Sequence, residues 1–135
     1  MLEWWRRLFP PQRDLGSAPR TGRQKTYSAD SGYVYQYVLS SFRQHRRVGE
    51  DLHEYTFEVS GGPGRKSSVA IVLKSSVLHT WIREHDREFS ASERYGIAKI
   101  ALKRELDSAE DPSSLAADVS PDAAQVDDIC RFLGL

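Results

Sequence analysis

The chain has 135 residues, of which 39% are hydrophobic, and this length and content suffice for the core of one ordinary domain. Its 19 Lys and Arg residues balance 19 Asp and Glu residues, which argues against a protein dedicated to polyanions. The single cysteine, Cys130, excludes an internal disulfide, and the charged N-terminus lacks the apolar run of a signal sequence or membrane span. We therefore expect a soluble, cytoplasmic protein.

Residues 1–31 are predicted to form an amphipathic segment followed by a flexible arm. Trp4 and Trp5 stand beside Arg6 and Arg7, in a stretch too short to be a stable helix alone. Such a segment can fold back onto its own domain or bind a groove of another protein or a second copy. A membrane is the weaker alternative, because two basic residues attract anionic lipid only weakly. Residues 10–31 are polar and aperiodic, which is typical of a linker.

Three segments with the pattern of β-strands follow. From residue 32 to residue 47 aromatic and β-branched side chains are frequent, and residues 53–59 alternate apolar with polar side chains. A glycine-rich connection over residues 60–67 is typical of a hairpin loop. Residues 69–73 are apolar on both faces, so this segment is predicted to be the central and most buried strand.

The first of three predicted helices covers residues 76–88. Ser75 or Ser76 is expected to cap it, and Trp81 lies in the middle of its apolar stripe. We therefore expect Trp81 to be a core residue that contacts the central strand.

The two later helices carry their own start signals. Ser90 and Glu93 have the spacing of a capping box, and an apolar stripe follows as far as Leu106. Ser120 and Pro121 are expected to begin the last helix. The order predicts an α+β domain over residues 32–135, in which a three-stranded antiparallel sheet is packed on one face by two to three helices.

No catalytic arrangement emerges from the sequence. His79 and His85 are six residues apart, which turns them away from a shared helix face, and Cys130 lies on an apolar stripe. The loop over residues 61–67 lacks both the spacing and the strand-to-helix context of a phosphate-binding loop. We therefore predict no catalytic residue, no metal site and no cofactor, and we expect that the protein is not an enzyme.

Charge is distributed unevenly along the chain. Residues 1–47 hold nine Lys and Arg against three Asp and Glu, whereas residues 48–135 hold ten against sixteen. This division indicates a basic binding surface, or an acidic C-terminal helix that docks on a basic strand or arm of the same molecule, or both. We favour internal docking or a mixture, because surface charges are usually only solvated.

Aromatic and basic residues together give the strongest binding signal. Tyrosines at alternate positions and nearby arginines are combined on platforms that stack nucleic-acid bases, although tyrosines with this spacing are more often sheet core. We predict a small binding or adaptor domain that recognises another protein or a second copy of itself; the alternative is a nucleic-acid-binding domain. The candidate binding residues are Trp4, Trp5, Arg6, Arg7, Tyr33, Tyr35, Tyr37, Arg43, Arg46 and Arg47.

Overall fold

The structure is a computed structural model of the chain and describes residues 23–135. The predictions for Trp4, Trp5, Arg6 and Arg7 therefore lie outside the described residues.

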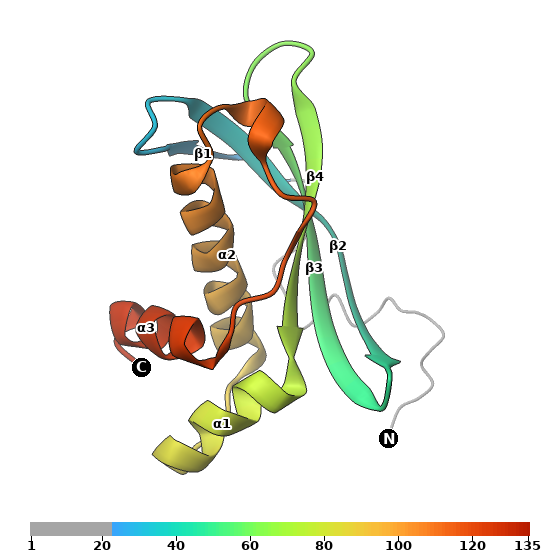
Figure 1. Cartoon of the computed structure of the whole chain (residues 1–135), viewed down its shortest axis with the longest axis vertical. Helices are drawn as coiled ribbons and strands as arrows, with labels where there is room; N and C mark the ends of the chain where they lie inside the picture. The colour runs from blue at the N-terminus through green and yellow to red at the C-terminus, as the bar shows by residue number, and fades with distance from the viewer. Residues whose placement is uncertain (1–22) are drawn as a thin grey trace.

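A five-stranded sheet and three helices make up this part of the chain (Figure 1). The strands are β1 (Lys25–Ser28), β2 (Val34–Arg47), β3 (Glu50–Ser60), β4 (Lys66–Lys74) and β5 (Asp118–Val119). Their order in the sheet is the order in the sequence; β1 to β4 are antiparallel, and β5 pairs with β4 in parallel. The α+β class is confirmed, but the predicted three strands are five.

The two unpredicted strands are short. β1 lies in the segment expected to be a linker, and β5 lies in the polar connection before the last helix. Neither strand has an alternation of apolar residues that would identify it in the sequence. Each is part of the sheet because it pairs with one longer neighbour. The strand over residues 69–73 is correspondingly not central, since β3 occupies the middle of the sheet.

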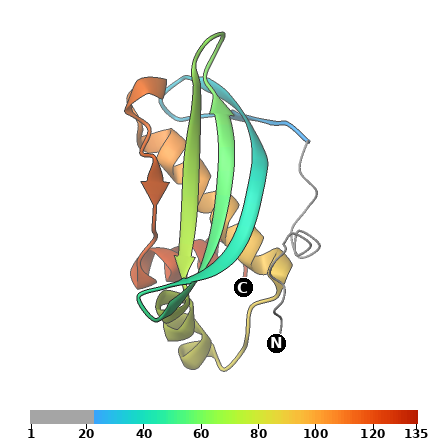
Figure 2. The ribbon, with the colours of Figure 1, turned by 90° about the vertical axis from the view of Figure 1, so that its right-hand side faces the viewer.

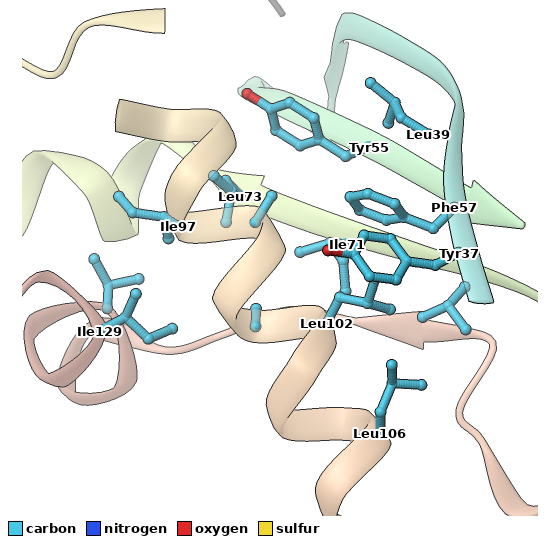
Figure 3. Close-up of a cluster of buried hydrophobic side chains, with 14 of the residues drawn as sticks. Tyr37, Leu39, Tyr55, Phe57, Ile71, Leu73, Ile97, Leu102, Leu106 and Ile129 are labelled. Atoms are coloured by element: carbon cyan, nitrogen blue, oxygen red, sulfur yellow. The ribbon is translucent and has the colours of Figure 1, made fainter. Parts of the chain in front are cut away.

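The helices are α1 (Ser75–His85), α2 (Ala91–Ser108) and α3 (Ala123–Leu133), with a single 3₁₀ turn, η3 (Pro112–Ser114), after α2. The three α-helices lie on one side of the long strands, and Figure 2 views the strands from the opposite side. Alternate residues of β2 and β3 therefore point toward the helices and into the core. Figure 3 shows Ile97, Leu102 and Leu106 of α2 in that core with aromatic side chains of the sheet.

Two of the three helices are capped differently from what the sequence predicted. Ser90 and Glu93 form the predicted capping box of α2. α1 begins after Lys74 without a side-chain cap of its own; instead, the Ser76 N–H donates to Glu50 Oε2 at 2.9 Å. α3 is capped by Asp122 and not by Ser120, because the Asp122 carboxylate accepts from the Gln125 N–H at 2.8 Å.

Candidate functional site

The three predicted binding tyrosines do not share one environment. Tyr35 and Tyr37 are 0% and 5% exposed and belong to the core, which confirms the core interpretation for these two. Tyr33 precedes β2 and is 39% exposed. Two of the three rings are therefore unavailable for stacking on bases.

The predicted arginines lie together in the second half of β2. Arg43 Nη2 is 3.2 Å from Glu54 Oε1, and Arg46 Nη1 is 2.6 Å from Asp51 Oδ1. Arg47 forms no ion pair with any residue between 23 and 135. Both acidic partners belong to β3, so two of these cations are balanced by the neighbouring strand.

The acidic C-terminal helix does not dock on this basic strand. In α3, Asp128 Oδ2 is 2.7 Å from Arg104 Nη1 of α2, and Asp127 pairs with Arg131 of the same helix at 3.1 Å. The expectation of docking on a basic strand is therefore wrong, because α3 packs against the other helices. Docking on the N-terminal arm concerns residues outside the described range.

One edge of β2 is the distinctive feature of this region. β1 pairs only with residues 34–37, whereas β2 pairs with β3 from Gln36 to Arg47. Within residues 23–135, no strand pairs with the other edge of β2 beyond Tyr37. In an antiparallel strand every second residue directs its N–H and C=O groups away from its partner, so this edge presents unpaired backbone groups.

A bulge divides this edge. Leu39 pairs with Phe57 and Ser41 with Thr56, so Ser40 is the extra residue. Its hydroxyl donates to the carbonyl oxygen of Thr56 at 3.0 Å. Regular pairing with β3 resumes from Ser41 to Arg47, and we refer to these seven residues as the free edge.

The free edge is held firmly from the helix-facing side. The Phe42 ring lies 4.7 Å from the ring of Tyr55 and 6.3 Å from that of His53, measured between centroids. On the opposite face, His45 Nε2 lies 2.8 Å from Glu54 Oε1. These contacts hold the free edge against β3, and no strand within residues 23–135 pairs with its outer side.

The hairpin between β2 and β3 ends in an unusual turn. Val48 and Gly49 have φ angles of 51° and 75°, the positive values that a type I′ hairpin turn requires at both positions. Val48 is 97% exposed, and a β-branched residue is strained at positive φ.

Charges are sorted by strand around the free edge. Arg23 and the two strands β1 and β2 carry only basic charges, whereas β3 carries only acidic ones. The basic side chains are Arg23, Lys25, Arg43, Arg46 and Arg47; the acidic ones are Glu50, Asp51, Glu54 and Glu58. β1 and β2 therefore form a cationic border of the sheet next to the anionic strand β3.

Two buried titratable groups are poorly suited to catalysis. His53 is buried, and burial together with the charge of Arg94 lowers its pKa to about 4, so the imidazole is neutral at pH 7. Burial raises the pKa of the Cys130 thiol to about 11, which disfavours the nucleophilic thiolate. No group of three or more His, Cys, Asp or Glu residues that could hold a metal ion occurs within residues 23–135.

A groove lies away from the free edge. This groove of about 260 Å³ opens between α2, β5 and α3, and it is lined by Ala101, Arg104, Glu105, Ser108, Val119, Pro121, Gln125 and Ile129. Arg104 at its rim is occupied by Asp128, and Glu105 Oε2 accepts from the Ala116 N–H at 2.9 Å. These polar groups therefore serve the packing of the C-terminal segment.

None of the helices described between residues 23 and 135 has the length and apolar character needed to cross a membrane. Comparisons with models of protein families, with curated proteins and with solved structures find no match for the chain.

Proposed function

We propose that the chain is a protein-binding module whose free edge accepts an extended segment of a partner as an additional strand. The observation that supports this most is the difference in length between β1 and β2, since β1 covers four residues of a fourteen-residue strand. Backbone hydrogen bonds give such an interaction its affinity, and side chains along the edge give it specificity.

The remainder of the hairpin suits this role. A rigid edge pays little ordering entropy on binding, and the free edge is fixed by the Phe42 contacts and by continuous pairing with β3. Val48 adds an exposed apolar side chain at the end of the edge. Strain at an exposed turn residue supports a functional role for the tip.

Nucleic-acid binding is the second candidate. The absence of acidic residues on β1 and β2 favours it, because these strands carry only basic charges, which attract the phosphates of a polyanion. The burial of Tyr35 and Tyr37 and the ion pairs of Arg43 and Arg46 weigh against it. Strand addition is therefore the better-supported proposal.

Selection of short peptides from a display library with the full chain as bait tests the proposal. Bound peptides should slow hydrogen exchange at every second amide of the free edge. A blocking variant is available, because the N–H of either Gln44 or His45 faces the open edge, and proline there leaves the ladder to β3 intact.

Gln44→Pro and His45→Pro are therefore compared, and the variant that keeps the wild-type melting temperature is used. It should lose peptide binding. Equal binding by this variant, or protection elsewhere in the chain, would contradict strand addition. Selection of no peptide, together with salt-sensitive binding of a fluorescent oligonucleotide, would support the nucleic-acid alternative instead.

A further inference from the structure

We infer that the segment accepted by the free edge is acidic, with carboxylate side chains at alternate positions. This inference rests on the proposed function, because it assumes that an extended peptide is the ligand. Successive side chains of an added strand point to opposite faces of the sheet. One alternate set therefore passes over the outer face and the other passes over the side of the helices.

The outer face offers cations to the first set. Arg43 and His45 share this face, since both contact Glu54. The guanidinium group of Arg43 is mostly exposed, and exposed ion pairs of this kind contribute little stability. Arg46 points to the other face, the side of the helices, as Phe42 does. An incoming carboxylate can therefore share Arg43 at small cost, and Arg47, which alternation places on the same face, is not engaged in any ion pair within residues 23–135.

The side of the helices offers a second group of cations beyond the bulge. Lys25 stands opposite Tyr37 and so points toward the helices with it. Lys103 Nζ of α2 lies 5.4 Å from the centroid of the Tyr27 ring, and Lys99 Nζ lies 4.9 Å from that of Tyr95. The three lysines are not in any salt bridge with residues 23–135.

These lysines repel one another. Burial, followed by the charges of Lys103 and Lys25, lowers the pKa of Lys99. A group of like charges that is partly shielded from water favours an anion as its neighbour. Cations therefore lie beside the free edge and also beside β1, which pairs with the same side of β2.

The same charges disfavour a second copy of this chain as the occupant. Pairing the free edges of two molecules would gather three arginines from each strand, Arg43, Arg46 and Arg47, along one seam. Like charges facing each other across a strand pair are destabilising. An acidic segment from a different protein, in contrast, is complementary along the whole edge.

Three fluorescein-labelled peptides of eight residues test this inference with the full chain: alternating Val-Glu, alternating Val-Ser and alternating Val-Lys. Binding is followed by anisotropy, and occupation of the free edge by hydrogen exchange. The Val-Glu peptide should bind about tenfold more tightly than Val-Ser, and its affinity should fall as salt rises. The Val-Lys peptide should not bind.

Arg47→Glu should weaken the Val-Glu peptide about tenfold and leave Val-Ser nearly unchanged. Arg83→Glu is the matched control, because Arg83 is an exposed arginine of α1 outside the free edge, and it should have no effect.

The outcomes separate the two proposals. Equal affinities for all three peptides, with protection of the free edge, would overturn the acidic preference and leave strand addition standing. Tight binding of Val-Glu without protection of the free edge would overturn strand addition and leave a cationic site. Absence of binding by every peptide would overturn both, and displacement of bound Val-Glu by an oligonucleotide without edge protection would favour nucleic acid.

Discussion

His53 is a neutral imidazole held in the core beside Phe42. It is 9% exposed, and its Nδ1 has no hydrogen-bond partner within the described part of the chain. Its pKa of about 4 in the folded protein lies below the ordinary value of 6.5. Between these two pH values the unfolded chain therefore binds more protons than the folded protein, so protonation favours unfolding.

We expect the free energy of unfolding to fall by about 3 kcal/mol as the pH falls from about 6.5 to 4, through this residue alone. Urea unfolding at several pH values checks this in the wild type and in His53→Gln, which cannot titrate. The stability of the wild type relative to the variant should decline across that range. A constant difference between them would show that His53 does not carry the effect.

Val48 is strained because its Cβ is branched and its φ is 51°. Asparagine tolerates this conformation better, so Val48→Asn should stabilise the protein by about 1 kcal/mol. Chemical denaturation measures the gain, and Val48→Ala is the control that shortens the side chain without supplying the asparagine preference. If Val48 contacts the partner, the stabilised variant should also bind the selected peptides less tightly. A loss of stability in Val48→Asn would show that the turn is not strained.

At the scale of elements, α1 is fastened by Trp81. The ring is 3% exposed, which confirms the core prediction, and its centroid lies 4.1 Å from that of His85 and 4.4 Å from that of Phe89. Trp81→Ala should cost about 3–5 kcal/mol, because it removes a large buried ring and leaves a cavity. Denaturant unfolding measures this cost, and Val77→Ala, at a partly buried position of the same helix, should cost less. A cost below about 1 kcal/mol for Trp81→Ala would contradict its place in the core.

Sequence patterns predicted those elements whose signals are local. The capping box at Ser90 and the apolar stripes of the three helices depend only on neighbouring residues, and they identified all three. β1 and β5 were not predicted, because they pair with residues distant in the sequence and their own sequences are polar. The cap of α1 was predicted wrongly for the same reason, since the carboxylate that accepts from the Ser76 N–H belongs to Glu50, twenty-six residues earlier.

For the candidate site, the sequence predicted which residues are basic but not how they are arranged. Arg43, Arg46 and Arg47 were identified from their charge, but the acidic partners of two of them became evident only once β3 was aligned with β2. The free edge itself is a consequence of where β1 ends, which no pattern within β2 records. Tyr35 and Tyr37 illustrate the converse, because alternation identified their shared face but not which side the helices cover.

At the scale of the whole molecule, the fold separates a closed side from an open border. Three helices bury one face of the sheet. The outer edge of β4 is paired in part with β5, and next to β5 the Ala70 N–H donates to the Ala117 carbonyl oxygen. On the other border, β1 stops opposite Tyr37. The basic side chains of β1 and β2 lie along this border, so, among residues 23–135, the unpaired backbone groups and these cations coincide.

Residue-resolved hydrogen exchange of the free, full-length chain tests the availability of this border most directly. Across the free edge, the amides that alternate away from β3 should exchange rapidly, while their neighbours bonded to β3, and the amides of β3 itself, should be protected. This alternation would show that the binding edge is open. Uniform protection from Ser41 to Arg47 would show that another segment already occupies it and would contradict the proposed site.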